Sequence, residues 1–273
     1  MQKNKAAFFD IDGTLFRNSL LIEHYFLMTK DGILDKENWE ENVKPLYQKY
    51  QDRKGPYEDY LDKASLLYQK NLKGIDKKTI NIYAKKVIEN NQSKIYRVTK
   101  NALEYHKKMG YKIFVISGSP DFLVRDFAKI YGADHTIATK YIFDDKDKFT
   151  GKILPMWDSK NKKKSIDFLT EEYNIDLENS HAYGDTNGDF SMFEKVGNAH
   201  AINPSYELIE RLYNNKKLRE KTKIHVERKD VKYTLCNSYS FIIRNRNRDS
   251  LNRKSRNRTS RGNFNNRNTY SFC

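Results

Sequence analysis

Three short apolar runs, each followed directly by acidic or small hydroxyl residues, constrain the fold of this chain more than any other feature. The runs cover residues 6–9, 113–116 and 181–184. The segments that follow them are Asp10-Ile11-Asp12-Gly13-Thr14, Ser117-Gly118-Ser119-Pro120 and Asp185-Thr186-Asn187-Gly188-Asp189. Apolar runs of this length bounded by turn residues indicate buried strands. Since helical patterns alternate with the later strands, we predict an α/β fold with a parallel sheet covered by helices.

The first segment places two carboxylates where the first strand ends. Asp10 and Asp12 stand two residues apart. One such carboxylate can attack phosphorus to form an aspartyl-phosphate, and the other can move a proton. Asp and Gly are also ordinary turn residues. The pentapeptide alone therefore leaves both a catalytic site and a surface turn open.

The second segment has the features of an anion site. Ser117 offers a hydroxyl, and Gly118 offers a free backbone N–H group at a strand-to-helix turn. Pro120 suits the first turn of a helix, and residues 121–130 carry apolar side chains at helical spacing. The alternative interpretation is a simple helix N-cap.

The third segment supplies ligands for a hard cation. The segment carries Asp185 and Asp189, and Asp185 together with Asp10 and a backbone carbonyl would form a site of the oxygen ligands that Mg²⁺ prefers. Asp, Asn and Gly are also common in plain loops, so this segment alone is weak evidence.

A lysine cluster precedes the third segment. A phosphoryl-transfer site needs a fixed cation on the phosphate oxygens. Lys162 is the preferred candidate because it shares one helical face with three apolar residues, which are Ile166, Leu169 and Tyr173. Lys163 and Lys164 remain alternatives, and most of the cluster is expected to be solvated surface.

Taken in order, these motifs resemble the haloacid dehalogenase-like hydrolase superfamily. Their spacing, and the long insert after the first motif, are similar to its phosphoserine-phosphatase-like subfamily. The similarity runs from about residue 6 to residue 204, and it includes Thr150-Gly151-Lys152-Ile153 and Ala201-Ile202-Asn203-Pro204. The resemblance implies a Rossmann-like core with helices on both faces and an inserted α-helical cap domain.

The resemblance also implies the roles of the two residues that act on phosphorus and protons. Asp10 would be the nucleophile and a Mg²⁺ ligand. Asp12 would be the general acid and base, and its backbone carbonyl would bind the metal.

The remaining roles implied by the resemblance concern phosphate and metal binding. Ser117, the Gly118 N–H and Lys162 would hold the phosphoryl oxygens. Asp185 would bind Mg²⁺, and Asp189 would support the metal or orient the lysine.

Two positions depart from the subfamily pattern. Phosphoserine phosphatases of this group carry an acidic residue nine positions after the nucleophile, where this chain has Ser19. They carry Asn just before the last Asp, where this chain has Gly188. These departures argue against phosphoserine as the substrate but do not affect phosphatase chemistry. Phosphoserine, histidinol phosphate, phosphocholine-like esters and sugar phosphates all stay open.

The domain organisation follows from helical patterns around the motifs. Residues 16–95 look helical and amphipathic, and they are interpreted as the cap, with Asp76 as the N-cap of one helix. Residues 1–15 and 96–214 would form the catalytic core, and residues 215–242 a C-terminal extension of it. A cap of this size would close over a small substrate. Arg17 opens the insert and either contacts substrate or is solvated.

The charge of the chain is concentrated at its C-terminal end. The net charge is +15, yet residues 215–273 hold 17 basic and 4 acidic residues, which is +13 of that total. Residues 243–273 form an Arg/Asn-rich tail without apolar periodicity, which is expected to be disordered. The tail is interpreted either as a basic arm that binds nucleic acid or an anionic surface, or as the product of an out-of-frame reading of an AT-rich gene.

Composition also bounds the cellular setting. No run of about 18 apolar residues predicts a membrane span. Cys236 and Cys273 both lie outside the expected catalytic core, and the first strand follows the N-terminus closely, so a cytoplasmic protein is expected. The sequence predicts a Mg²⁺-dependent phosphatase acting on a small phosphorylated metabolite. The alternatives are a phosphotransferase or mutase on the same scaffold, or a nucleic-acid-binding protein acting through its tail.

Overall fold

The structure is a computed structural model that describes residues 3–52, 54, 57–227 and 232–235. The Arg/Asn-rich tail at 243–273, with the partners predicted for it, and both cysteines lie outside these residues. Within the described part of the chain, no helix combines the length and the apolar composition needed to cross a membrane.

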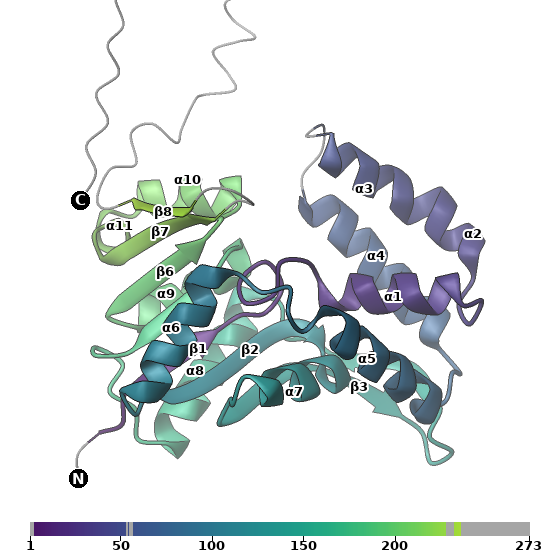
Figure 1. Cartoon of the computed structure of the whole chain (residues 1–273), viewed down its shortest axis with the longest axis horizontal. Coiled ribbons are helices and arrows are strands. Elements are labelled where there is room, and N and C mark those ends of the chain that lie inside the picture. Colours follow the sequence, from purple (N-terminus) through teal and green to yellow (C-terminus); the bar gives the residue numbers. More distant parts are fainter. Residues whose placement is uncertain (1–2, 53, 55–56, 228–231, 236–273) are drawn as a thin grey trace, which may run out of the picture.

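Eight strands of the described residues form one sheet in the order β4-β3-β2-β1-β5-β6-β7-β8 (Figure 1). The strands are β1 (Ala6–Phe9), β2 (Lys112–Pro120), β3 (His135–Phe143), β4 (Phe149–Leu154), β5 (His181–Gly184), β6 (Asn198–Ile202), β7 (Thr222–Glu227) and β8 (Lys232–Leu235). The inner strands β3, β2, β1, β5, β6 and β7 are mutually parallel. The edge strands β4 and β8 run antiparallel to their neighbours. The predicted α/β, Rossmann-like core is confirmed.

Helices cover both faces of the sheet. Side chains of β1 alternate between two hydrophobic cores, with Ala7 and Phe9 in one and Ala6 and Phe8 in the other. This explains the unbroken apolar run, because a parallel strand buried on both faces has no polar side. The first core is closed by α6 (Arg97–Lys108) and α7 (Asp121–Ile130), and the second by α8 (Ser159–Glu172), α9 (Phe190–Lys195), α10 (Tyr206–Asn214) and α11 (Lys216–Lys221).

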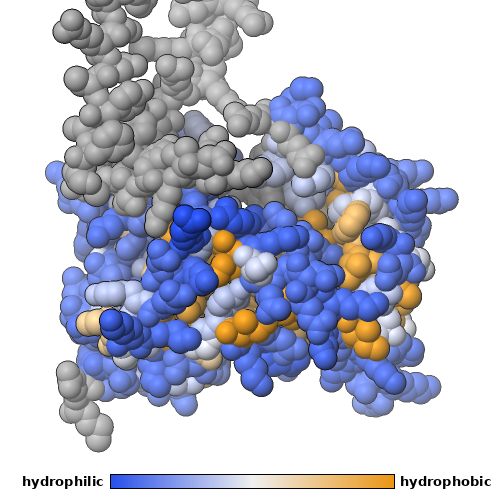
Figure 2. Space-filling view, viewed as in Figure 1, coloured by the Kyte–Doolittle hydropathy of each residue, from blue (hydrophilic) through white to orange (hydrophobic). Residues whose placement is uncertain are grey.

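The outer surface is largely polar, as expected when the apolar side chains lie in the two cores. Figure 2 shows a largely hydrophilic face on which hydrophobic residues appear only in small patches. Many large aromatic side chains, such as Phe8, Phe114 and Phe127, are instead fully buried. The main apolar surface of the described chain is therefore used to hold helices on the sheet.

The chain between β1 and β2 forms the predicted helical insert, which lies beside one end of the sheet (Figure 1). Its elements are α1 (Leu20–Lys30), α2 (Lys36–Asn38), the π-helical turn η1 (Trp39–Val43), α3 (Lys44–Gln51), α4 (Tyr57–Leu72) and α5 (Lys77–Asn91). Asp76 caps α5 as predicted, since its carboxylate accepts the Thr79 N–H at 2.8 Å. The domain boundaries at residues 16 and 95 stay a prediction.

Arg17 links the insert to the far side of the sheet. Its guanidinium forms an ion pair with Glu227 at the end of β7, and its Nε donates to the Ile95 carbonyl at 3.1 Å. The guanidinium also lies over the Tyr96 ring, 4.6 Å from the centroid. Arg17 thus makes structural contacts that the sequence does not indicate, and its side chain is still 36% exposed, in line with the expected solvation. A contact of Arg17 with substrate stays a prediction.

Glu227 holds the start of α6 as well. Its carboxylate accepts the backbone N–H groups of Arg97 at 3.0 Å and Val98 at 2.8 Å. Burial raises the pKa of Glu227, but these two hydrogen bonds and the Arg17 guanidinium outweigh burial and leave the pKa below its ordinary value. A carboxyl group of this kind stabilises the fold above its unfolded-state pKa, and this contribution is lost as the pH falls through the lowered folded-state pKa.

Replacing Glu227 with Gln is therefore expected to lower the free energy of unfolding at neutral pH by about 1–3 kcal/mol. The difference from wild type should shrink as the pH falls below about 4, where the wild-type carboxyl is protonated as well. Urea unfolding at both pH values measures this, with the exposed Glu210→Gln as control. A pH-independent difference would contradict the role of the charge.

Candidate active site

Three of the predicted motifs meet at the carboxyl edge of the sheet. β1 lies between β2 and β5, and the chain departs from it to both sides. Asp10 follows β1 directly and donates its N–H to the Tyr183 carbonyl of β5 at 3.0 Å. Ser117 lies near the end of β2, and Asp185 follows β5. Such a switch point is where open α/β sheets bind their ligands.

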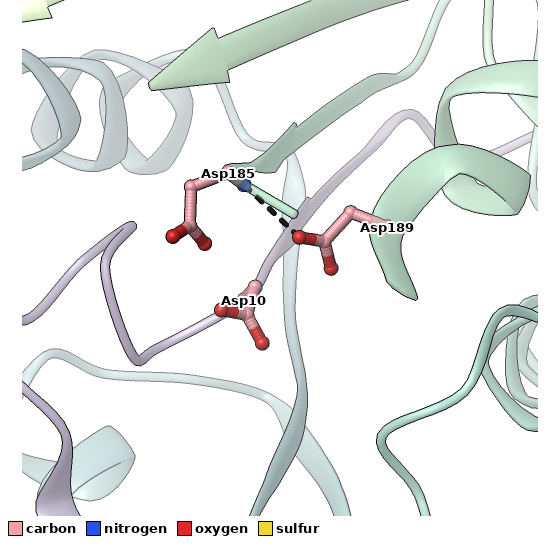
Figure 3. Close-up of side chains that lie close together, drawn as sticks. All are labelled: Asp10, Asp185 and Asp189. Carbon is pink, nitrogen blue, oxygen red and sulfur yellow. Dashed lines mark hydrogen bonds between the residues drawn. The ribbon is translucent and has the colours of Figure 1, made fainter. Parts of the chain in front are cut away.

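Three carboxylates gather at this edge. Asp10, Asp185 and Asp189 each offer one oxygen atom, and these atoms all lie within 4.8 Å of one another. Figure 3 shows the three side chains directed toward a common space from the ends of separate segments. Asp10 and Asp189 are buried, and Asp185 is partly buried.

The loop after β5 fixes the two later carboxylates. Asp189 Oδ2 accepts the N–H groups of Asp185 and Thr186, each at 3.0 Å, in a capping arrangement at the turn η2 (Asn187–Asp189). Thr14 donates its hydroxyl to Asp185 Oδ1 at 3.0 Å, which joins this loop to the first motif. No pattern in the sequence indicates this contact of Thr14.

Gly13 is required between the two acidic segments. It has φ of +79°, and a Cβ atom there would lie 2.0 Å from Asp185 Oδ2. Any side chain would therefore be strained by the backbone conformation and would also displace the Asp185 carboxylate. The glycine of the first motif keeps the acidic cluster close together.

Lys162 lies inside the cluster. Its Nζ is 2.7 Å from Asp10 Oδ1 and 2.5 Å from Asp189 Oδ1. It projects from the first turn of α8, whose N-cap Asp158 accepts the Asn161 N–H. Lys162 is only 3% exposed, whereas the neighbouring lysines 163 and 164 are exposed. Of the candidate lysines, the structure brings only Lys162 to the carboxylates.

Asp12 is held separately from the three carboxylates. Its Oδ1 accepts the Leu20 N–H at the start of α1 at 2.6 Å, and its Oδ2 accepts the Ser117 hydroxyl at 3.4 Å. Burial raises the pKa of Asp12, and hydrogen bonds from Ser119 and the Leu20 N–H oppose this. The Asp12 side chain lines the same cavity as Asp10.

The second motif lies beside Asp12. Ser117 is fully buried, and its Oγ accepts the Ser119 N–H at 3.1 Å. Gly118 lines the cavity, and its carbonyl accepts the Thr139 hydroxyl at 2.7 Å. The segment thus lies where the predicted phosphate-binding role would place it, and that role stays a prediction.

The electrostatics of the cluster favour a cation. Burial raises the pKa of Asp10, with Lys162 opposing and Asp189 adding to it, and burial together with Asp10 and Asp189 raises the pKa of Asp185. Burial lowers the pKa of Lys162, but the two carboxylates outweigh it and raise the pKa overall. The single ammonium group thus leaves the ionised forms of Asp10 and Asp185 under-compensated, and a bound cation would stabilise them.

The donor set fits Mg²⁺. The cluster supplies only hard oxygen ligands, which this ion prefers. In the same loop, the buried Asn187 Oδ1 has no hydrogen-bond partner among the described residues, so a further oxygen is left available. The residues that would hold the ion are the predicted ones, and the identity of the metal stays a prediction.

A cavity of about 410 Å³ lies over the cluster. Its floor includes Asp10, Asp12 and Lys162, and the helix α4 forms another wall. The α4 residues that line it recur at helical spacing, and they are Leu61, Asp62, Ser65, Leu66 and Gln69. Sequence reasoning missed these residues and Trp157, because a helical stripe does not indicate which neighbour it faces.

The family model for haloacid dehalogenase-like hydrolases matches residues 7–194, which is more than half of the chain. The chain therefore belongs to this family. The match includes the acidic first motif, the lysine and the acidic loop after β5.

The similarity to individual proteins is at low sequence identity. The chain is 27% identical to a phosphoserine phosphatase of Methanocaldococcus jannaschii, over 72% of this chain and 84% of that protein. It is 31% identical to an inhibition of morphological differentiation protein of Streptomyces azureus, but it spans only 41% of that protein's length. A substrate-bound phosphoserine phosphatase structure aligns with a TM-score of 0.56 and 25% identity, covering 77% of this chain and 91% of that one.

Proposed function

We propose that this protein is a Mg²⁺-dependent phosphatase that hydrolyses a small phosphate monoester through an aspartyl-phosphate on Asp10. The observation that carries the proposal is the bridge of Lys162 between Asp10 and Asp189 beneath the cavity. A nucleophilic carboxylate, a fixed cation and a cluster of metal ligands are the parts that phosphoryl transfer requires.

The reaction proceeds in two displacements. A carboxylate oxygen of Asp10 attacks phosphorus, the bond from phosphorus to the ester oxygen breaks, and Asp12 gives a proton to the leaving alcohol. Water then attacks phosphorus while Asp12 takes its proton, and the acyl-phosphate bond breaks to release phosphate and free Asp10. The Leu20 N–H supports this assignment because it orients the Asp12 carboxylate at the cavity wall.

The phosphoryl oxygens need donors throughout. The Ser117 hydroxyl, the Gly118 N–H and the Lys162 ammonium are the groups proposed to hold them. Lys162 is already within hydrogen-bond distance of the Asp10 oxygen, so a phosphoryl group transferred to Asp10 would meet its charge at once.

The metal would be held by the side chains of Asp10, Asp185 and Asp189 and by the backbone carbonyl of Asp12. When bound, Mg²⁺ would neutralise charge on the phosphoryl oxygens, so that an anionic substrate can approach an anionic nucleophile. Asp189 has a second task, because it also contacts Lys162 and fixes the loop after β5.

Removing divalent metal with EDTA is expected to lower phosphate release by about a hundredfold, and added Mg²⁺ should restore it. The measurement is phosphate release from a panel of small esters, with a second assay for phosphate transferred to an added alcohol. Equal release with and without EDTA would contradict the metal requirement. Transfer to alcohol in preference to water would instead favour the phosphotransferase alternative.

A further inference from the structure

The cavity over Asp10 has apolar walls that the reaction itself does not use. Trp157, in the loop between β4 and α8, lines the cavity and is 49% exposed. Leu66 of α4 lines it as well and is 65% exposed. Leu21, Leu61 and Ile153 add further apolar lining. Large apolar side chains exposed in a cavity gain free energy when an apolar group covers them.

The backbone of Trp157 lies close to two motif loops. A Cβ atom on Gly118 would lie 2.8 Å from Trp157 Cβ, and a Cβ atom on Gly188 would lie 2.4 Å from the Trp157 carbonyl oxygen. Any larger residue at position 188 would displace the Trp157 backbone. Gly118 and Gly188 therefore let the backbone at Trp157 lie against the phosphate-binding and metal-binding loops.

The charges that line the cavity are unbalanced. Beyond Asp10, Asp12 and Lys162, the charged side chain among the described residues of the lining is Asp62. The α4 wall contributes no described basic residue, and Ser19 lines the cavity without a charge. A substrate carboxylate would therefore lack a cationic partner and would face Asp62, while an amine or hydroxyl group could donate to it.

We infer that the preferred substrate is a phosphate monoester of a carboxylate-free alcohol with an apolar body, which packs between Trp157 and the α4 wall. An amine or hydroxyl of the leaving group would face Asp62. This inference rests on the proposed function, since it concerns the leaving group of the same reaction. It argues against phosphoserine, whose carboxylate finds no partner in the lining.

Matched esters test the inference directly. O-phosphoethanolamine and O-phosphoserine differ only in a carboxylate, as do phosphotyramine and phosphotyrosine. In both pairs the carboxylate-free ester should have a kcat/KM at least about tenfold higher. Phenyl phosphate should bind to the inactive Asp10→Asn variant about tenfold more tightly than ethyl phosphate, because its ring covers more of the apolar walls. Binding excludes the faster cleavage that phenol causes as the better leaving group.

Substitutions of residues that line the cavity should change the ratios of kcat/KM or of affinity between the paired esters. In the Asp10→Asn variant, Trp157→Ala and Leu66→Ser should each reduce the preference in binding for phenyl over ethyl phosphate, and Trp157→Ala by about tenfold. Asp62→Asn should reduce the difference in kcat/KM between each carboxylate-free ester and its carboxylate-bearing partner. Leu154→Ala is the matched control, because Leu154 is 59% exposed, lies three residues from Trp157 and does not line the cavity.

Two results would overturn the inference. One is phosphoserine hydrolysed better than phosphoethanolamine, and the other is a phenyl-to-ethyl affinity ratio unchanged by both Trp157→Ala and Leu66→Ser. Calorimetric binding of the same esters to Asp10→Asn separates this question from the chemistry. If wild type hydrolyses no ester, the proposed function fails, while the order of binding still supports or overturns the inferred selectivity.

Discussion

Asp10→Asn is expected to lower phosphate release by about ten-thousandfold or more, because the amide oxygen cannot form an acyl-phosphate with the substrate. Asp10 follows β1 directly, is buried and contacts Lys162, so no neighbouring group is expected to replace it at the same point. Asn has nearly the same shape as Asp, so the cavity should be preserved. Rates should be measured at saturating Mg²⁺ with the best ester of the panel.

The covalent step can be followed apart from the steady-state rate. Wild type quenched with acid after brief reaction with a ³²P-labelled ester should retain label on the peptide that contains Asp10, and Asp10→Asn should retain none. The exposed Asp126→Asn is the matched control and should label like wild type. Wild-type turnover in the Asp10 variant would remove this residue from the mechanism.

The convergence of the acidic motifs was predictable because it depends on local pattern and on the geometry of parallel sheets. Each motif follows an apolar run, and parallel strands end at one edge. Asp10 and Asp185 therefore had to meet once β1 and β5 paired, as the structure confirms. The position of Lys162 was predictable for a similar reason, since it shares the buried helical face of Ile166 and Leu169.

Contacts between distant segments were not predictable from such patterns. Arg17 pairs with Glu227, 210 residues away, because β7 joins the sheet beside β6 and ends near the start of α6. Nothing in the sequence around Arg17 distinguishes it from a solvated residue. Trp157 likewise reaches the cavity only because two glycines in separate loops leave room for its backbone.

Lys162→Met is expected to reduce kcat/KM by about a thousandfold, because a fixed cation on the phosphoryl oxygens acts mainly in the transition state. The same change should lower the free energy of unfolding by about 3–5 kcal/mol in EDTA, since it leaves Asp10 and Asp189 buried without their shared partner. Urea unfolding and steady-state kinetics measure the two effects on one protein. Both effects arise from a single ammonium group that is only 3% exposed.

Lys163→Met is the matched control, because Lys163 is the next residue of α8 and is exposed. It should leave both turnover and stability near the wild-type values. Normal turnover of the Lys162 variant would show that another cation binds the phosphoryl group. A variant that loses stability but keeps its rate would show that the buried ion pairs serve the fold alone. Loss of both is the expected result, since the same ammonium group neutralises the carboxylates at rest and would neutralise the phosphoryl group during turnover.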